Sequence, residues 1–334
     1  MQHGAAGRSL LTDSSLQSLI SLRGLANMSE SFAIETRDLG YRFGALTAVE
    51  ALNLRVPKGS ICGFLGPNGA GKTTTIRLLL GLLRPSSGTV LIDGQSIPKT
   101  GKNLRRRIGA LIETPTLYPN LTGRENLEVL RRLLDLPPTN ISEALHLVRL
   151  TDDSDRLVRT YSLGMRQRLG LAIALLGYPD LVILDEPANG LDPAGVHEFR
   201  DLLRTLVKQH GATVFLSSHL LAEVEQIADR IAILNRGRLL FQGSLGEFQA
   251  QRGKVLILRV DRPEEAASVL RLNGWHVDSR PDGTLSLTVA QMSDTAAVNA
   301  LLGKSSLAVY HLAQEQESLE ALFLKATARR EEHV

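Results

Sequence analysis

The stretch that decides the fold is GPNGAGKTT, residues 66–74. It fits the pattern G-x-x-x-x-G-K-[ST], follows an apolar run, SICGFL, and precedes a helical pattern, TTTIRLLLGLL. Glycines let backbone N–H groups turn towards phosphate oxygens, and the start of a helix adds a partial positive charge. We therefore expect the whole loop to surround a nucleotide: Gly66, Pro67, Asn68, Gly69, Ala70, Gly71, Lys72, Thr73 and Thr74.

The second chemical motif is LVILDEP, residues 181–187. Its continuous apolar run has the length of a strand buried on both faces of a parallel sheet. Asp185, at the end of that strand, is expected to hold Mg²⁺ together with the Thr73 hydroxyl. Glu186 projects differently and can polarise a water molecule aimed at the γ-phosphate, while Lys72 reaches the β- and γ-phosphates. The two motifs together predict hydrolysis of Mg·ATP.

Composition excludes several other classes of protein. The formal net charge is +3, and the densest basic cluster, Arg105–Arg107, predicts a solvated helix face, so no nucleic acid partner is expected. The single cysteine, Cys62, excludes an internal disulfide and fits a small buried side chain in a reducing cytoplasm. No run of 18 apolar residues is present, so the chain is not expected to span a membrane.

The chain divides into three parts by pattern. Residues 1–30 form a polar extension that is expected to be poorly ordered, and Met28 is an alternative start. Residues 31–247 are predicted to form the nucleotide-binding domain, with a helical subdomain at about 115–178. Residues 250–334 are predicted to form a small α/β domain.

Local signals predict individual elements. Thr122 and Glu125 have the spacing of a capping box, and the crossover helix RDLLRTLVKQHG is expected to end at Gly211. ATVFLSSH predicts a second buried strand. In the last part, KVLILRV predicts a strand, a helix starts at Pro263, and a hairpin turns at Asp282-Gly283. Trp275 is expected to belong to the core of this part.

Further motifs follow in a fixed order and carry a family resemblance. YSLGMRQRLGLA contains Ser162 and Gly164, NGLD ends at Asp192, FLSSH ends at His219, and YRFG contains Phe43. With the two motifs above, this order is similar to that of the ATP-binding subunits of ABC transporters over about residues 34–245. The resemblance implies an α/β P-loop NTPase core with antiparallel β and helical subdomains, followed by the small C-terminal α/β domain.

The same resemblance implies roles for these residues. Phe43 would stack on adenine, and His219 would contact the γ-phosphate. Ser162, Gly164 and Asp192 would bind nucleotide across a head-to-tail dimer, made of two copies or of this chain and a paralogue. The membrane-spanning permease would be a separate chain, and the protein would lie at the cytoplasmic face of a bacterial cell membrane.

The signature departs from the family form LSGGQ, because Leu163 and Met165 replace a glycine and a glutamine. Leu163 is tolerable if it is already helical and strained if its φ is positive. Ser162 can cap the helix that follows, and the N–H groups of that helix can face phosphate.

A second departure is Glu113, in IGALIE, where the family has a glutamine. A carboxylate binds Mg²⁺ more strongly than an amide does, so Glu113 is predicted to bind the metal and to couple hydrolysis to transport. This glutamate resembles the E-loop of the transporters that confer resistance to bacitracin and lantibiotics. The alternative is an ordinary loop acid.

Two other functions stay open at this point. One is a soluble ABC-type ATPase acting on a partner outside the membrane. However, the translation factors of that class carry two cassettes, and the DNA-repair relatives separate their motifs by a long coiled coil. The other is a regulator that cannot hydrolyse ATP, against which Lys72, Asp185, Glu186 and His219 are all present. The cargo does not follow from the sequence, and export is indicated only by the resemblance.

Overall fold

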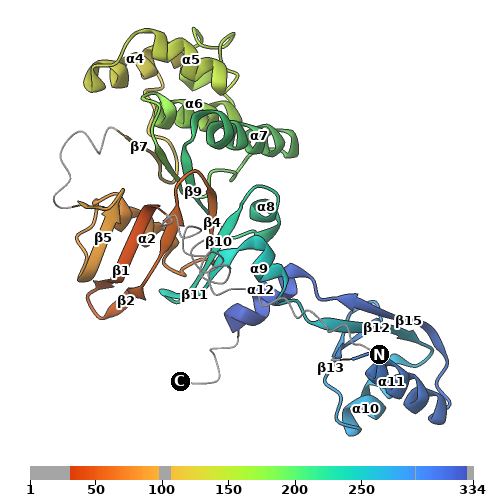
Figure 1. Ribbon diagram of the computed structural model, residues 1–334. Coiled ribbons are helices and arrows are strands. Elements are labelled where there is room, and N and C mark those ends of the chain that lie inside the picture. The colour runs from red at the N-terminus through yellow and green to blue at the C-terminus, as the bar shows by residue number, and fades with distance from the viewer. Residues whose placement is uncertain (1–30, 98–106, 290, 329–334) are drawn as a thin grey trace, which may run out of the picture.

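The structure is a computed structural model that describes residues 31–97, 107–289 and 291–328 (Figure 1). The predicted N-terminal extension, residues 1–30, lies outside the described residues, as do Arg105 and Arg106 of the basic cluster. Within these ranges, no helix has both the length and the apolar character that a membrane crossing requires.

A six-stranded sheet forms the centre of the larger part, in the order β11-β10-β4-β9-β8-β7. The neighbours from β10 to β7 run parallel, and β11 is antiparallel to β10. The strands are β4 (Ile61–Leu65), β7 (Ile108–Leu111), β8 (Leu181–Leu184), β9 (Thr213–Ser218), β10 (Arg230–Asn235) and β11 (Arg238–Ser244). Every residue of β4, β8 and β9 is buried, which confirms the prediction of central strands covered on both faces.

A second, antiparallel sheet lies beside the first. Its order is β2-β1-β5-β6, and β3 also pairs with β1. The strands are β1 (Phe32–Phe43), β2 (Leu46–Leu52), β3 (Arg55–Pro57), β5 (Ser87–Ile92) and β6 (Gln95–Ser96). Helix α2 (Lys72–Leu79) buries Ile76 and Leu79 in the apolar core that also contains Phe64 of β4 and Ile34 of β1. This core fixes the start of α2 relative to both sheets.

The helical subdomain comprises α4 (Gly123–Leu134), α5 (Thr139–Leu147), the 3₁₀ turn η2 (Val158–Thr160) and α6 (Leu163–Leu175). The predicted capping box is present, since Thr122 accepts from the Glu125 N–H while the Glu125 carboxylate accepts from the Thr122 N–H. Figure 1 places α4 and α5 farthest from the sheets, with α6 beneath them. Gly109 of β7 allows the contact with α6, because a Cβ there would lie 2.0 Å from the Ala174 carbonyl oxygen.

The crossover between β8 and β9 is α7 (Pro193–His210). Its C-cap is Gly211 with a φ of 65°, a left-handed conformation that glycine adopts at little cost, so the predicted end of the helix is confirmed. The short helices α8 (Leu221–Glu225) and α9 (Leu245–Gln249) follow β9 and β11.

The last part of the chain forms a small sheet with its own core. The chain order is β12 (Lys254–Val260), α10 (Pro263–Leu272), β13 (Val277–Ser279), β14 (Leu285–Val289), α11 (Met292–Lys304) and β15 (Val309–Gln316). The sheet order is β13-β14-β12-β15 and all pairs are antiparallel, which is the split β-α-β arrangement. The strand KVLILRV and the helix from Pro263 form as predicted, and Trp275 packs against this core half-buried.

The hairpin between β13 and β14 differs from the prediction of a turn at Asp282-Gly283. The Gly283 N–H donates to the Arg280 carbonyl oxygen at 3.0 Å, so the turn spans Arg280–Gly283 with Pro281 and Asp282 at its centre. Pro281 supplies the negative φ that the first central position needs, and Gly283 follows with a φ of 79°. The centre of the turn therefore lies one residue earlier in the chain than predicted, because Pro281 occupies its first central position.

Helix α12 (Leu319–Ala328) does not join the small sheet. Leu319 and Phe323 are buried in the core of the larger part, α12 contacts α8, and the Asn235 side chain donates to the Thr327 carbonyl oxygen at 2.6 Å. Leu319 and Phe323 are four residues apart and therefore share one helix face. The sequence analysis predicts that this helix belongs to the small domain, residues 250–334. In the structure its apolar face packs on the nucleotide-binding part instead. Phe248 of α9 is buried in the same core, beyond the boundary expected at residue 247.

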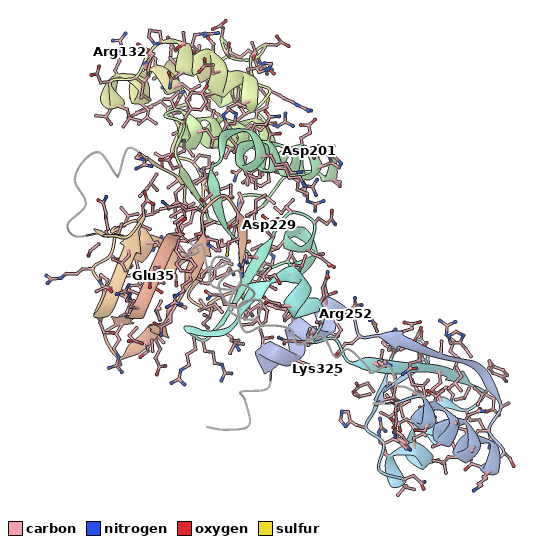
Figure 2. The ribbon with its side chains drawn as sticks, in the orientation of Figure 1. Glu35, Arg132, Asp201, Asp229, Arg252 and Lys325 are labelled. Atoms are coloured by element: carbon pink, nitrogen blue, oxygen red, sulfur yellow. The ribbon has the colours of Figure 1, made fainter. Side chains whose placement is uncertain are left out.

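The two parts are joined by a narrow neck through which the chain passes twice. The Glu317 N–H donates to the Gly253 carbonyl oxygen at 2.8 Å, and the Arg252 guanidinium donates to the Glu317 carbonyl oxygen. The buried Glu317 carboxylate pairs with Lys325 of α12 at 2.6 Å. Figure 2 shows Arg252 and Lys325 near the point where the two parts meet.

The docking of α12 gives a stability prediction. Replacement of Phe323 by alanine removes a buried aromatic ring and is expected to lower the free energy of unfolding of the larger part by about 2–4 kcal/mol. Leu324→Ala is the matched control on the same helix, because Leu324 is exposed, and its effect is expected to stay within about 0.5 kcal/mol. Denaturant unfolding of the full chain measures both, and equal effects of the two variants would contradict the docked position of α12.

Candidate functional site

The phosphate loop lies between β4 and α2, at the carboxyl edge of the parallel sheet. Gly71 is the N-cap of α2 with a φ of 106° and no side-chain cap, so the first N–H groups of the helix are left for another acceptor. A Cβ on Gly71 would lie 2.4 Å from the Ala48 carbonyl oxygen, and one on Gly66 would lie 2.4 Å from that of Leu234. Glycine is therefore required at both ends of the loop by close backbone contacts.

The ammonium group of Lys72 lies inside this loop. Its Nζ donates to the carbonyl oxygens of Gly66 at 2.8 Å and Pro67 at 3.4 Å, and it pairs with the Glu186 carboxylate at 3.2 Å. The side chain is only 7% exposed. A buried cation is thus held at the centre of the loop by one carboxylate and two backbone oxygens.

Glu186 connects Lys72 to His219. One carboxylate oxygen faces Lys72, and the other lies 2.9 Å from His219 Nδ1. The Glu186 backbone has a φ of 49°, a conformation that costs roughly 1–3 kcal/mol outside glycine. The structure therefore brings together three predicted catalytic residues and holds the central one in a strained backbone conformation.

Asp185 ends β8 and is 1% exposed. Its Oδ1 accepts from the Ser217 hydroxyl at 2.6 Å, whereas its Oδ2 is buried and has no hydrogen-bond partner among the described residues. An orphaned buried carboxylate oxygen is costly unless something binds it, so this atom fits a cation ligand. No group of three His, Cys, Asp or Glu residues in the described ranges could hold a metal alone. This fits Mg²⁺, which is usually bound by one or two protein groups, water and phosphates.

Ser217 is a functional residue that the sequence analysis did not single out. Its hydroxyl donates to Asp185 and accepts from the Glu186 N–H at 2.8 Å, so one oxygen orients both acidic residues. The signal was present as a hydroxyl in an otherwise apolar strand, and the pairing of Leu184 with Leu216 places it beside Asp185. Only the pairing of β8 with β9 shows the connection.

Phe43 lies at the end of β1 and is 47% exposed. Its ring packs edge-on against Tyr41, with ring centroids 4.8 Å apart. It lines a cleft of about 330 Å³ together with Leu46, Thr47, Ala48, residues 68–74 and Glu186. A partly exposed ring at one end of a cleft and the phosphate loop at the other suit a molecule with a flat base and a polyphosphate.

Glu113 follows β7, and its carboxylate pairs with Arg77 of α2 at 2.7 Å. Its φ is 56°, and its side chain is 60% exposed. The structure thus brings Glu113 to α2, the helix that starts with the phosphate loop, through Arg77.

Ser162, Gly164 and Asp192 do not line the cleft around the phosphate loop. Ser162 is the N-cap of α6 and accepts from the Met165 N–H at 3.2 Å, and Asp192 caps α7 in the same way through Gly195. Leu163 is the first residue of α6, so the expectation that it is tolerated in a helical position is confirmed. A Cβ on Gly190 would lie 2.5 Å from the Leu163 side chain, so Leu163 packs on the loop before Asp192.

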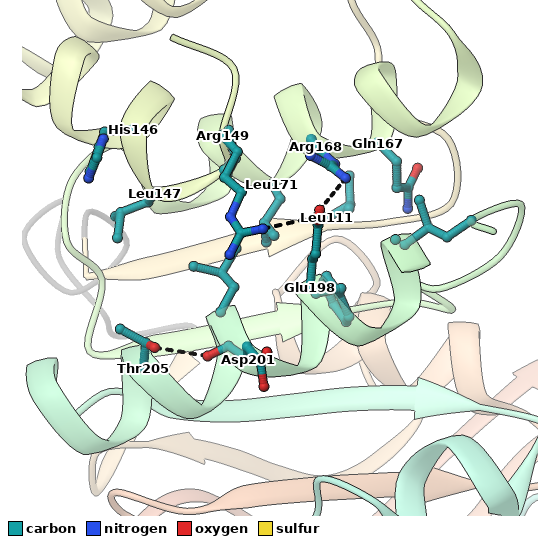
Figure 3. A pocket seen from close by; sticks show the side chains of 15 residues that line it. Leu111, His146, Leu147, Arg149, Gln167, Arg168, Leu171, Glu198, Asp201 and Thr205 are labelled. Carbon is teal, nitrogen blue, oxygen red and sulfur yellow. Dashed lines mark hydrogen bonds and ion pairs between the residues drawn. The ribbon is translucent and has the colours of Figure 1, made fainter. Parts of the chain in front are cut away.

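A second cavity, of about 280 Å³, lies between α6 and α7 (Figure 3). Arg149 and Arg168 both pair with Glu198 there, which links the helical subdomain to α7. Nearby, the buried Gln167 donates to the Pro187 carbonyl oxygen at 3.0 Å, next to Glu186. None of the predicted site residues lines this cavity, and its contacts join α6 to the segment that carries the catalytic acid.

Cys62 is buried in β4, and this burial raises the pKa of its thiol to about 12. The thiol is therefore protonated at neutral pH and takes no part in the site.

Comparisons with known proteins agree with this geometry. The family model for the ABC transporter matches residues 49–189. The bacitracin transport ATP-binding protein BcrA of Bacillus licheniformis is 39% identical over 300 residues, which cover 88% of this chain and 97% of BcrA. The lantibiotic transport ATP-binding protein SrtF of Streptococcus pyogenes is 38% identical over 209 residues, covering 63% and 90%. A solved ATP-binding subunit of an ABC transporter has a TM-score of 0.60 at 31% identity, covering 66% of this chain and 92% of that one.

The hydroxyl of Ser217 gives a direct test of the site. Ser217→Ala leaves the Glu186 N–H without its acceptor and releases one oxygen of Asp185, so ATP turnover is expected to fall about tenfold. Steady-state hydrolysis by the full chain measures the loss, with Ser268→Ala, on the exposed face of α10, as a control that should keep wild-type turnover. Unchanged turnover in Ser217→Ala would show that neither acid depends on this hydroxyl.

Proposed function

Because the chain belongs to the ATP-binding subunits of ABC transporters and is an ATPase, we propose that it powers an exporter whose membrane-spanning part is a separate chain. The observation that carries the site assignment is the contact of Glu186 with both Lys72 and His219 at the phosphate loop. Each of these groups has a task in hydrolysis that follows from its position.

Binding of ATP rearranges the Lys72–Glu186 pair. The N–H groups at the start of α2 donate to the phosphate oxygens, and the Lys72 ammonium turns from Glu186 to the β- and γ-phosphate oxygens. The adenine stacks on Phe43 at the other end of the cleft. The Thr73 hydroxyl and Asp185 Oδ2 would hold Mg²⁺, which would supply positive charge against the phosphate oxygens.

Release of Lys72 frees the carboxylate of Glu186 for catalysis. Glu186 then accepts a proton from the water that attacks the γ-phosphate. His219, whose Nδ1 lies 2.9 Å from the same carboxylate, is positioned to exchange this contact for a hydrogen bond that it donates to the γ-phosphate. The buried hydroxyl of Ser217 holds both acids in place during this exchange.

A second copy or a paralogue completes the site. Ser162 caps α6 by accepting from the Met165 N–H and does not line the chain's own cleft, and Leu163 beside it is half exposed. In a head-to-tail dimer, Ser162 and Gly164 would contact the nucleotide bound by the partner's phosphate loop, with Asp192 adjacent. The resemblance of these motifs to those of the family supports these contacts with the partner.

The exporter role includes a place in the cell and a class of cargo. We place the protein at the cytoplasmic face of a bacterial membrane, bound to its permease through the helical block of residues 115–160. Glu113 would serve as a further metal ligand and would couple hydrolysis to transport, a role that its resemblance to the E-loop transporters supports. Relatives named for bacitracin and lantibiotic transport and for daunorubicin/doxorubicin resistance support an antimicrobial peptide or a drug as cargo.

The catalytic assignment is tested with Glu186→Gln, which keeps the shape of the side chain but cannot accept a proton. ATP turnover by the full chain is expected to fall at least about 100-fold while ATP binding is retained. Glu225→Gln, an exposed acid on α8, is the matched control. If the wild type hydrolyses no ATP, alone or with a co-purified permease, the assignment of the chain as an ATPase is wrong. If Glu186→Gln turns over as fast as wild type, only the role of Glu186 fails.

The base-stacking role of Phe43 makes a separate prediction. Phe43→Ala is expected to weaken ATP binding about tenfold, since stacking on an aromatic ring contributes about 1–3 kcal/mol per base. Binding of tripolyphosphate, which has no base, is expected to be unchanged in the same variant. Calorimetric titration of both ligands separates the two effects, and an equal loss for both would place Phe43 in the structure of the loop instead.

A further inference from the structure

Arg77 has a contact that the proposed mechanism does not use. Its Nη2 lies 2.7 Å from Oε1 of Glu113, and this bond joins α2 to the segment after β7. The two side chains are 40% and 60% exposed. Exposed ion pairs contribute little to the stability of a fold, so a stabilising role does not explain the presence of this pair.

The position of Arg77 on α2 relates it to the metal site. Arg77 follows Thr73 by four residues, so the two lie on the same face of the helix, one turn apart. Long side chains in a helix lean back towards its N-terminus, which carries the guanidinium of Arg77 over the turn that contains Thr73. A carboxylate bound to that guanidinium is therefore drawn towards the first turn of α2.

The central sheet also directs Glu113 towards the first turn of α2, because β7 ends at the carboxyl edge of the sheet. The Asp185 N–H donates to the Leu111 carbonyl oxygen at 2.8 Å, because β7 and β8 are parallel neighbours. Glu113 stands two residues beyond Leu111, so it leaves the same edge of the sheet as Asp185. The left-handed backbone at Glu113 then turns its side chain to α2, where Arg77 binds one of its two carboxylate oxygens.

We propose that Arg77 is the positioning residue for Glu113. Its guanidinium binds Oε1 of Glu113 beside α2 and leaves Oε2 free of this contact, so that Oε2 would be the ligand for Mg²⁺ held by Thr73 and Asp185. It also balances the charge of a carboxylate that would otherwise stand unpaired beside the triphosphate. This inference rests on the proposed metal-binding role of Glu113.

The test compares ATP binding to the full chain with Mg²⁺ and with EDTA, and the ratio of the two affinities is the magnesium preference. Glu113→Ala is expected to lower this preference about tenfold and Arg77→Gln about fivefold, since both remove a positioned carboxylate ligand. The double variant is expected to match Glu113→Ala within about twofold, because Arg77 acts only through Glu113. Loss of the Arg77 charge alone weakens bare ATP at least as much as Mg·ATP and does not lower the ratio.

The matched control is Arg37→Gln, which breaks another exposed ion pair, with Glu35, and should leave the preference unchanged. Arg77→Lys keeps the charge without the planar group and is expected to restore part of the preference. A preference in Arg77→Gln equal to or above wild type, or losses that multiply in the double variant, would overturn the inference. If Glu113→Ala itself leaves the preference unchanged, the metal role of Glu113 fails first.

Discussion

The parallel pairing of β4, β9 and β8 is the constraint on which the site depends. Ligand sites in such sheets form beyond the carboxyl ends of the strands, where the chain leaves the hydrogen-bonded ladder. Here β4 ends at the phosphate loop, β8 at Asp185 and β9 at Ser217 and His219. A shift of one residue in the β8–β9 register would turn the Ser217 hydroxyl to the other face and separate it from both acids. The apolar residues of these strands thus set the positions of the polar atoms at the strand ends.

At this edge the Glu186 carboxylate lies beside Lys72, in the position that the phosphates of ATP are proposed to occupy. Lys72 is nearly buried and needs a counter-charge, and Glu186 supplies it in the same conformation that brings His219 within hydrogen-bond distance. This arrangement pairs the Glu186 carboxylate with a cation. In the proposed mechanism the phosphates compete for that cation, so the contact would link substrate binding to the release of the Glu186 carboxylate.

The parts of the site that sequence predicts are those in which one short segment carries both the structure and the chemistry. Gly66–Thr74 and LVILDEP are of this kind, and so are the capping box at Thr122 and the end of α7 at Gly211. Contacts between distant segments are not visible in a pattern: Ser217 with two acids, Arg77 with Glu113, and Phe323 in the larger core. The glutamate at 113 could be singled out as unusual, but its partner across 36 positions could not be read from the sequence.

The neck at Gly253 and Glu317 shows how the small sheet is attached to the larger part of the chain. Because α12 returns to the larger core, the small sheet is an insertion whose entry and exit are already hydrogen-bonded to each other. An insertion of this kind can be exchanged, enlarged or deleted without breaking any strand of the nucleotide-binding sheet. Residues 254–316 therefore mark the segment that could be replaced in a chimera while α12 keeps its place on the larger core.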